Sequence, residues 1–370
     1  MKMTLCAPCL FGIEGILGDE LRRMGAENVR PENGRVLFDG DEYMLARANI
    51  QSRYAERVQI LMGSFRAVTF EQLFQGVKAL PWEAFIGKED AFPVKGWSLN
   101  STLHSVPDCQ AITKKAIVER LKTAYRIDWF EETGAQFQVQ VTILKDEVSV
   151  LLDTSGMGLH KRGYRANAMD APIKETLAAA IGDVMRVRRA EQVIDPCCGS
   201  GTLLIEAGLA SARIAPGIRR RFAAQGWDCI SETVWEQERE RARSLEIADC
   251  RTQLIGSDID NAALSLCRDN AAKAGVADRL RTACRDLCDF RPEGEHGVVI
   301  CNPPYGERLG DVETARRIIR TMGRVFQPKP GWSYGIISPD EEFEKLFGRP
   351  ASKRRKLYNG MLKCNLYLYF

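Results

Sequence analysis

The sequence predicts an α/β protein in which a doubly wound parallel sheet follows two smaller α+β units. Three observations lead to this prediction. Beyond residue 160, short apolar strands alternate with helical segments and end in glycine-rich or acidic turns. Before residue 155, apolar and polar residues alternate along the clearest strand, which is typical of a sheet with one buried face. The segment Ser155–Gly158 is rich in small residues and is the best candidate for a linker between the halves.

The composition is that of a globular protein that stays in the cytosol. The chain has 370 residues, of which 45% are hydrophobic and 27% charged, enough for two or three domains. No apolar run reaches the roughly 18 residues that span a bilayer, and Pro8 and Glu14 interrupt the apolar N-terminus, which makes it a poor signal peptide. We therefore expect no membrane partner, and we expect a monomer.

The first fifty residues predict a small α+β unit. Residues Gly15 to Met24 form an amphipathic pattern that Gly25 would close as a C-cap. Val36 to Gly40 then read as a short strand and turn.

Residues from about Leu45 to Asp153 predict a second α+β unit. Helices are expected from Thr69, as N-cap, to Val77 and from Ile112 to Tyr125. Alternation from Phe137 to Ile143 and the return from Val148 to Leu152 predict a hairpin, which we expect at an edge of this unit.

The remaining residues predict the doubly wound sheet. A helix is expected to run from an Asp170 cap, through Pro172 in its first turn, to about Arg186. Strands at 192–194, 254–257 and 298–301 are separated by helices at 202–211 and 262–274, the latter closed by Gly275. Residues 365–370 alternate as a final strand, expected at a sheet edge.

A glycine-rich turn, Asp195–Thr202, follows the first of these strands. Gly199 and Gly201 have no Cβ and would let a ligand approach the backbone closely. A tight turn without any ligand would explain the same residues. The dinucleotide fingerprint GxGxxG and the lysine of a phosphate loop are both absent, which disfavours a nicotinamide cofactor or a nucleoside triphosphate.

Two acidic turns follow the next strands. Asp258 ends the strand at 254–257 and could accept both hydroxyl hydrogens of a ribose, whereas Asp260 could instead cap the following helix. Asp286 could accept from an adenine amino group, but alone it is better explained as an ordinary loop carboxylate.

The most specific motif is Asn302-Pro303-Pro304-Tyr305, directly after the strand at 298–301. The two prolines fix the backbone and remove two donors, which leaves the Pro303 carbonyl and the Asn302 side-chain oxygen as acceptors. Two such acceptors suit the exocyclic amine of a nucleobase, and Tyr305 could stack the base. A structural Asn-Pro-Pro turn is the alternative, but all four signals follow strands in the expected order.

The twelve cysteines do not predict a metal site. Cys6 and Cys9 form a single CxxC with no second pair and none of the three histidines nearby. Two buried thiols in a reducing compartment are the better interpretation.

Together these motifs resemble the class I S-adenosylmethionine (SAM)-dependent methyltransferases that modify exocyclic amines. Leu159–Arg165, Ala171–Leu177 and Asn302–Arg308 further resemble the THUMP-domain RNA methyltransferases, which include bacterial enzymes that make N2-methylguanosine in large-subunit ribosomal RNA. The resemblance implies a ferredoxin-like unit at 1–50, a THUMP domain at 51–155 and a Rossmann-like methyltransferase domain at 160–370. Cys197-Cys198 departs from the aromatic residue that the family often places there.

The resemblance also implies roles for individual residues. Asn302, Pro303, Pro304 and Tyr305 would position the target amine and base. The residues implied in SAM binding are Asp195, Cys197, Gly199, Ser200, Gly201, Thr202, Asp258, Ile259, Asp286, Leu287 and Asn302, with Pro172 and Thr176 closing the pocket.

RNA is the expected partner, and its phosphates would contact basic segments. Net charge is only +3, but residues 345–363 hold seven Lys or Arg and no acid. A solvated surface is the alternative explanation. The candidates are Lys114, Lys115, Arg120, Lys122, Lys161, Arg162, Arg165, Lys353, Arg354, Arg355 and Lys356.

The implied reaction is direct methyl transfer to guanine N2 of large-subunit ribosomal RNA, without a metal. Guanine N2 of tRNA, adenine N6, and a non-catalytic RNA-binding assembly factor remain alternatives.

Overall fold

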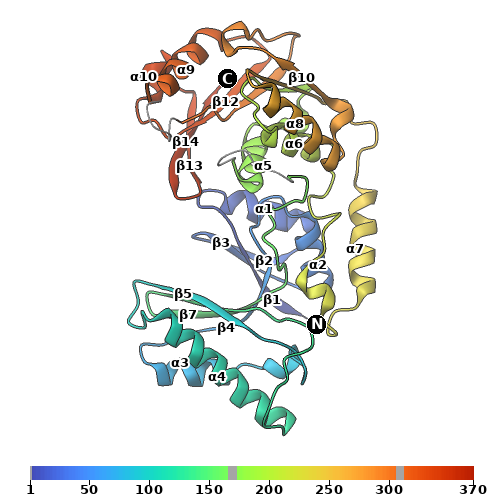
Figure 1. The fold of residues 1–370 in the computed structure, drawn as a ribbon, viewed down its shortest axis with the longest axis vertical. Coiled ribbons are helices and arrows are strands. Elements are labelled where there is room, and N and C mark those ends of the chain that lie inside the picture. The colour runs from blue at the N-terminus through green and yellow to red at the C-terminus, as the bar shows by residue number, and fades with distance from the viewer. Residues whose placement is uncertain (1, 166–172, 306–311) are drawn as a thin grey trace.

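The computed structural model describes residues 2–165, 173–305 and 312–370. In this part of the chain two seven-stranded sheets lie one above the other along the long axis of the molecule (Figure 1). Sheet one holds β1 to β7 and sheet two holds β8 to β14, so the boundary between them falls near the predicted linker.

Sheet one joins the two predicted N-terminal units into a single structure. Its strand order is β2-β3-β1-β4-β7-β6-β5, and β1 pairs with β4 antiparallel across the boundary near residue 50. The strands are β1 Met3–Pro8, β2 Glu27–Glu32, β3 Arg35–Gly40, β4 Gln59–Arg66, β5 Val94–Leu99, β6 Val139–Leu144 and β7 Glu147–Asp153.

The predicted hairpin exists as β6–β7, but its expected place at an edge is wrong. Strand β5 pairs parallel with β6 and occupies the edge instead. The polar residues of β6 lie on the sheet face that carries no helices, so they do not indicate a position at the edge of the sheet. The hairpin turn itself places Lys145 and Asp146 at positive φ, 53° and 66°, as a two-residue I′ turn requires.

Four helices cover one face of sheet one. They are α1 Glu14–Met24, α2 Glu42–Gln51, α3 Phe70–Lys78 and α4 Val106–Tyr125, with a short 3₁₀ turn at Trp82–Ala84. Gly25 closes α1 in the left-handed conformation and the Thr69 side chain caps α3, as predicted. Helix α4 begins at Val106, earlier than the predicted Ile112, with Pro107 in its first turn.

The opposite face of sheet one points away from these helices. Val141 and Ile143 of β6 are buried under the helices, whereas Leu144 is 43% exposed on the other side. Trp97 of β5, also 43% exposed, pairs in register with Thr142 on that side. We call the side that carries Trp97, Thr142 and Leu144 the uncovered face.

Sheet two is the predicted doubly wound sheet, with order β10-β9-β8-β11-β12-β14-β13. Its strands are β8 Gln192–Asp195, β9 Gln253–Asp258, β10 Leu280–Cys284, β11 Gly297–Cys301, β12 Trp332–Ser338, β13 Lys353–Asn359 and β14 Leu362–Tyr369. The first five are parallel. The C-terminal strand is not at the edge as expected, because β13 pairs with its outer side.

The helices of this half are α5 Glu175–Val184, α6 Thr202–Ser211, α7 Glu232–Ser244, α8 Asn261–Ala274, α9 Val312–Val325 and α10 Phe343–Phe347, with 3₁₀ turns at Val187–Arg189, Ala223–Gly226, Ala277–Arg279 and Leu287–Asp289. Helix α5 begins at Glu175 with Lys174 as N-cap, so the expected start at an Asp170 cap is wrong. Asp170 and Pro172 themselves lie outside the described residues.

In the described ranges no helix is both long and apolar enough to cross a membrane.

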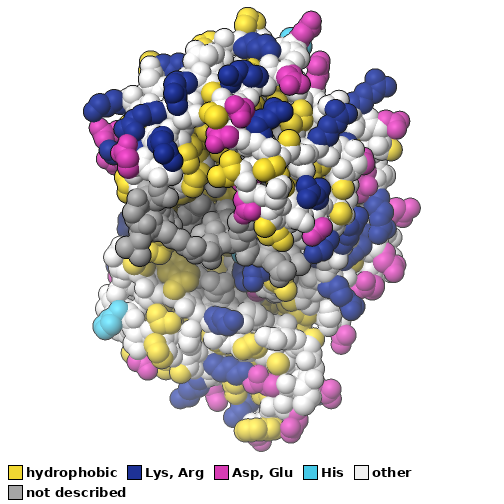
Figure 2. All heavy atoms as spheres, turned by 45° about the horizontal axis from the view of Figure 1, so that its top comes forward, with side chains coloured by type: hydrophobic (Ala, Val, Ile, Leu, Met, Phe, Trp, Pro, Cys, Tyr) yellow, Lys and Arg dark blue, Asp and Glu magenta, His cyan; other side chains and the backbone are white. Residues whose placement is uncertain are grey.

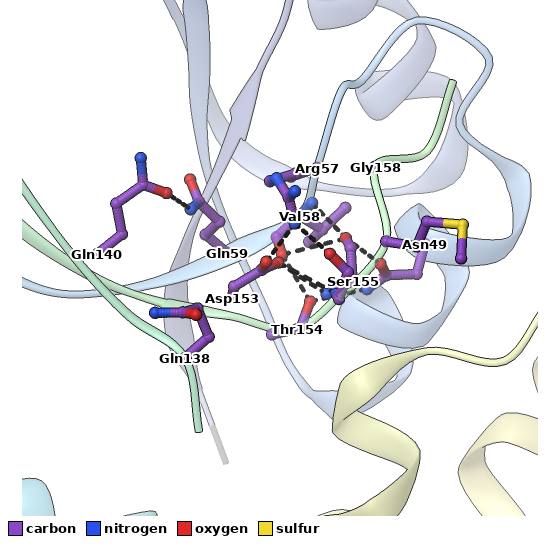
Figure 3. Close-up of polar contacts among 12 residues, drawn as sticks. Asn49, Arg57, Val58, Gln59, Gln138, Gln140, Asp153, Thr154, Ser155 and Gly158 are labelled. Carbon is purple, nitrogen blue, oxygen red and sulfur yellow. Dashed lines mark hydrogen bonds and ion pairs between the residues drawn. The ribbon is translucent and has the colours of Figure 1, made fainter. Parts of the chain in front are cut away.

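Ser155, the first residue of the predicted linker, and the preceding Thr154 lie in a buried polar junction (Figure 3). Ser155 is 1% exposed, and its Oγ donates to Asn49 Oδ1 (2.6 Å) and accepts from the Val58 N–H (2.8 Å). Thr154 Oγ1 accepts from Asn49 Nδ2 (2.9 Å) and donates to the Val58 carbonyl (2.7 Å). Small polar residues therefore serve here as hydrogen-bonding partners within the fold, which is why they resemble a linker in sequence.

A second contact ties the halves together along the side of the molecule. Helix α7, from the half that contains sheet two, runs down to α2 (Figure 1), where Arg47 binds Glu238 through two hydrogen bonds of 2.8 and 2.6 Å. Arg53, which is buried, reaches the carbonyls of Leu209 and Ile214 at 3.2 and 2.8 Å. The two halves are thus packed against each other through buried polar contacts.

Candidate active site

The predicted functional residues meet at one edge of sheet two. Asp195 ends β8, Asp258 ends the neighbouring β9, and Asn302 follows β11 on the other side of β8. The strands β9 and β10 lie on one side of β8, and β11 lies on its other side. The gap between β8 and β11 is therefore the topological switch point of the sheet. Crevices at such points are the usual ligand sites of open α/β sheets.

The glycine-rich turn is fastened to the end of β9. The Gly199 N–H donates to Asp258 Oδ2 at 2.9 Å, and the Cys198 N–H donates to the Ser257 carbonyl at 3.0 Å. Asp195 lies beneath the turn and accepts from the Cys197 N–H at 3.1 Å. Burial raises the Asp195 pKa to about 8, although the Cys197 hydrogen bond opposes this shift.

The two glycines of this turn serve different purposes. Gly201 has φ +83° and precedes α6, and a Cβ there would collide with Cys267 Sγ. Gly199 also has a positive φ, but no atom lies within 4 Å of where its Cβ would be. Gly201 is therefore needed for packing, while Gly199 leaves open space beside the turn.

The structure shows the capping role suggested for Asp260, while the ribose contact of Asp258 stays a prediction. Asp260 caps α8 by accepting from the Ala262 N–H at 2.8 Å. Asp258 stays at the sheet edge, and Ile259 beside it is 72% exposed.

Asp286 lies in the turn that follows β10. It caps the 3₁₀ turn at Leu287–Asp289 through the Cys288 N–H at 2.8 Å, and this hydrogen bond lowers its pKa. Leu287 is buried. Asp286 is thus a capping loop carboxylate that remains exposed next to the site.

These features fit SAM, the cofactor that the resemblance implies. Ile259, which follows Asp258, exposes an apolar side chain, and the Arg285 N–H donates to the Asp258 carbonyl at 3.0 Å, so the turns that carry Asp258 and Asp286 are neighbours. An apolar side chain beside two carboxylates suits an adenosine, which has a flat ring and polar groups. The space beside Gly199, at the N-terminus of α6, suits the methionine part.

In the Asn302–Tyr305 motif, the Tyr305 hydroxyl donates to Asn302 Oδ1. Pro303 is buried and Pro304 exposed. The hydroxyl of Tyr305 thus orients the amide, a contact that sequence reasoning missed in giving it only a stacking role. Residues Gly306 to Arg308, which contributed to the resemblance, lie outside the described residues.

Arg165 lies beside the cofactor turn rather than at an RNA surface. It donates to Thr202 Oγ1 at 2.8 Å and to the Ile173 carbonyl at 3.0 Å, and it lies 3.7 Å from Glu175. Arg165 therefore links the start of α5 to the start of α6.

Glu56, in the segment between α2 and β4, was not predicted as part of this region. Its Oε1 accepts from Thr176 Oγ1 at 2.5 Å, and its Oε2 lies 3.0 Å from His160 Nδ1 and 3.3 Å from Lys174 Nζ. Burial opposes ionisation of Glu56, but hydrogen bonds from His160 and Thr176 outweigh it and lower the pKa to about 2. No local pattern in the sequence marks Glu56, because its partners lie more than a hundred residues away.

The expected RNA contact of Arg162 is wrong. Its side chain is 2% exposed, lies 3.4 Å from Glu206, and donates to the carbonyls of Leu159 and Arg53. Burial of a guanidinium requires such partners, so Arg162 is a structural residue.

Most basic residues of α4 are engaged with neighbours. Lys114 binds Glu132 (2.5 Å), Arg120 binds Glu83, and Lys122 lies 3.8 Å from Glu119. Lys115 lies 6.0 Å from the centre of the Phe74 ring.

Residues Lys353–Lys356 are not a tail but part of edge strand β13. Arg354 lies 3.3 Å from Glu344, and Arg355 donates to the Gly12 carbonyl at 2.9 Å. Lys161 is exposed. The RNA-binding roles of these residues stay predictions.

Cys6 and Cys9 are both buried, as expected for two apolar thiols. Burial raises the Cys6 pKa to about 12.

Three family models match the chain. Residues 162–367 match the RMKL-like methyltransferase domain, residues 4–59 the RlmL ferredoxin-like domain and residues 67–153 the THUMP domain.

Several solved structures resemble the whole chain, among them the following two. A protein described as a "predicted N6-adenine-specific DNA methylase" from Listeria monocytogenes is 45% identical, with a TM-score of 0.93, covering 100% of this chain and 96% of that one. SMU.472, "a putative methyltransferase complexed with SAH", is 41% identical, also with a TM-score of 0.93, covering 100% and 98%.

Curated relatives agree with these matches. "Putative RNA methyltransferase YpsC" of Bacillus subtilis is 42% identical over 100% of this chain and 96% of its own length. The ribosomal RNA large subunit methyltransferase K/L of Psychromonas ingrahamii is 31% identical over 98% of this chain, which spans only 49% of that longer protein. The chain therefore belongs to the RMKL-like family of SAM-dependent RNA methyltransferases, with RlmL ferredoxin-like and THUMP domains before its methyltransferase domain.

Proposed function

We propose that this chain methylates the exocyclic N2 of a guanine in large-subunit ribosomal RNA. The observation that supports this most directly is the amine-binding motif: Asn302–Tyr305 follows β11 at the switch point, across β8 from Asp258 and the glycine-rich turn. The family and the K/L relatives favour ribosomal RNA, and the resemblance stated above favours guanine.

Asn302 would bind the target amine through its side-chain oxygen. The Tyr305 hydroxyl already donates to this oxygen and holds the amide in one orientation. A carbonyl oxygen has two lone pairs, so one remains for an N–H of the amine. The Pro303 carbonyl, fixed by the following Pro304, would accept from the second N–H.

These contacts would turn the nitrogen lone pair toward the methyl donor. When bound, SAM would supply a methyl group on a sulfonium: the N–C bond forms as the C–S bond breaks, S-adenosylhomocysteine leaves, and the methylated nitrogen releases one proton to water. The contribution of Asn302 and Pro303 is therefore to hold the nitrogen about 3 Å from the methyl carbon and in line with the bond that breaks. A base within a helix cannot reach this edge of the sheet, so the target must be flipped out or lie in a loop.

Labelled SAM, tested with unmodified large-subunit ribosomal RNA and bulk tRNA and followed by digestion to nucleosides, checks the proposal. N2-methylguanosine from ribosomal RNA is the expected product. N2-methylguanosine from tRNA alone would overturn the RNA class, and N6-methyladenine would overturn the base. Binding of SAM and RNA without any product would favour the assembly-factor alternative.

The Asn302→Ala variant tests the role of the motif. We expect methyl transfer to fall by at least two orders of magnitude, while the Kd for SAM stays within threefold of the wild type. Asn33→Ala, in the exposed turn between β2 and β3, is the matched control and should retain activity. Turnover of Asn302→Ala near the wild-type rate would contradict the proposed role.

A further inference from the structure

A groove between α9 and α10 concentrates positive charge that the active site does not use. It encloses about 690 Å³. Its described lining residues include four arginines and no carboxylate; they are Arg317, Arg320, Gly323, Arg324, Gln327, Leu346, Phe347, Gly348 and Arg349. Figure 2 shows Lys and Arg side chains gathered over the upper part of the molecule, where α9 and α10 lie in Figure 1.

Three of these arginines form a row along α9. Positions 317, 320 and 324 are separated by three and four residues, so they lie on one side of the helix. The distance along the helix axis is about 4.5 Å from Arg317 to Arg320 and about 6 Å from Arg320 to Arg324. Such a row fits a ligand that carries several negative charges along a chain better than it fits one isolated anion.

Two of the row remain available for an external anion. Arg320 is paired with Glu313 at 2.6 Å. Arg324 donates to Thr321 Oγ1 at 3.0 Å, and no described carboxylate forms an ion pair with Arg324 or Arg317. Unpaired guanidinium groups are the preferred partners of phosphate oxygens in proteins.

The opposite wall of the groove is built around Arg349. Its guanidinium carbon lies 4.8 Å from the centre of the Phe347 ring and 5.1 Å from that of Tyr369, and it donates to the Phe326 carbonyl. Gly323 permits the close approach of α9 and α10, because a Cβ there would collide with the Phe347 carbonyl. The groove is therefore a defined feature of the packing rather than a gap between mobile side chains.

Helix α9, one wall of the groove, packs against the turn at Leu287–Asp289, beside the cofactor site. Helix α9 begins at Val312, shortly after Tyr305 in the sequence. Arg317 also acts electrostatically on Asp286 in the turn beside the cofactor site. A nucleic-acid strand that leaves the site can thus reach the arginine row without crossing the molecule.

We propose that this groove binds the phosphodiester backbone of the RNA strand that flanks the target nucleotide. The proposal rests on the RNA substrate of the proposed function and adds the surface that holds it. Backbone contacts position a nucleic acid without reading its bases, so the groove would set the register of the strand and not the choice of base.

The double variant Arg317→Gln/Arg324→Gln tests the proposal by salt-dependent RNA binding. Filter binding of a large-subunit ribosomal RNA fragment is measured from 50 to 300 mM KCl. Each phosphate contact contributes about 0.7–0.9 to the slope of log K against log salt, so losing two contacts should reduce the slope by about 1.4–1.8. We expect the Kd for RNA to rise about tenfold or more at 100 mM KCl and the Kd for SAM to stay unchanged.

Two further variants control for charge and for folding. Arg241→Gln/Arg243→Gln removes two exposed arginines from the last turn of α7, away from α9, and should keep the wild-type slope. Arg317→Lys/Arg324→Lys keeps both charges and should restore most of the slope. In methyl-transfer assays the glutamine variant should raise the KM for RNA and keep kcat.

The failure of this proposal is distinguishable from that of the proposed function. A glutamine variant whose slope and RNA Kd match those of the α7 control would overturn the groove proposal, whatever product the enzyme makes. A reduced slope in an enzyme that yields no N2-methylguanosine would support the groove and reject the proposed reaction.

Discussion

Replacing Glu56 by glutamine should destabilise the fold by removing a charge that binds the segment between α2 and β4 to the start of α5. The carboxylate is surrounded by Thr176, His160 and Lys174, and its side chain is only 18% exposed. Glutamine keeps the shape and an acceptor for Thr176 but has no charge. The variant therefore isolates the electrostatic part of the contact.

The pKa of Glu56 gives the size of the effect. Its pKa falls from 4.5 to about 2 on folding. Each unit corresponds to about 1.4 kcal/mol, so the ionised carboxylate contributes about 3 kcal/mol near pH 7. Because the folded pKa is the lower one, this stabilisation is present above pH 4.5 and is lost as the pH falls toward 2.

Urea denaturation of the wild type and Glu56→Gln, at several pH values between 7 and 3, measures this effect. The free energy of unfolding should differ by about 3 kcal/mol at pH 7, and the difference should shrink to less than half at pH 3. Glu27→Gln, which removes an exposed ion pair with Lys2, is the control and should change little at any pH. Equal stability of Glu56→Gln and wild type at pH 7, or a difference independent of pH, would refute the reasoning.

Two further predictions concern the cofactor turn. Gly201→Ala should weaken SAM binding and destabilise the protein by about 1–3 kcal/mol, because the new Cβ would collide with Cys267 and the φ of this residue is positive. Calorimetry measures the SAM Kd and thermal melting measures the stability. Gly226→Ala is the control, because no atom lies within 4 Å of its new Cβ. Asp258→Asn should raise the Kd for SAM about tenfold or more, because it removes a charged acceptor that also holds the Gly199 N–H; an unchanged Kd by calorimetry would contradict the assigned role.

The sequence predicted the catalytic half well because its signals are local. The helix at Thr202–Ser211 and the closure of α8 by Gly275 match the structure, since each follows from a strand end, a turn and an apolar pattern within a few residues. The carboxyl ends of parallel strands meet at one edge, so Asp195, Asp258 and Asn302 could be brought together from their order alone.

The errors arose where a residue depends on distant partners. Arg162 has the composition of a surface residue, and only the fold supplies Glu206 and two buried carbonyls around it. For Lys353–Lys356 the RNA contact stays a prediction, because charged residues in an edge strand such as β13 also prevent pairing with another chain. Composition alone does not separate these two uses.

Strand placement was the other gap. The alternation in β6 shows that one face is buried, but it carries no information about which strands lie beside it. Strand β5 pairs with β6 in parallel through a connection that contains all of α4, and this pairing has no local signature around Gly96 and Trp97.

The contacts of Arg47 with Glu238 and of Arg53 with the Leu209 and Ile214 carbonyls hold sheet one and sheet two in one arrangement. The distance from the uncovered face of sheet one to Asn302 is set when the chain folds and does not adapt to the RNA that arrives. The entropy lost by fixing the two halves relative to each other is part of the cost of folding and does not recur each time RNA binds. If the proposed function is right, an RNA that contacts both sheets would be methylated only when its own fold brings the target nucleotide to that separation, and a helix lengthened by a few base pairs would be bound and left unmodified.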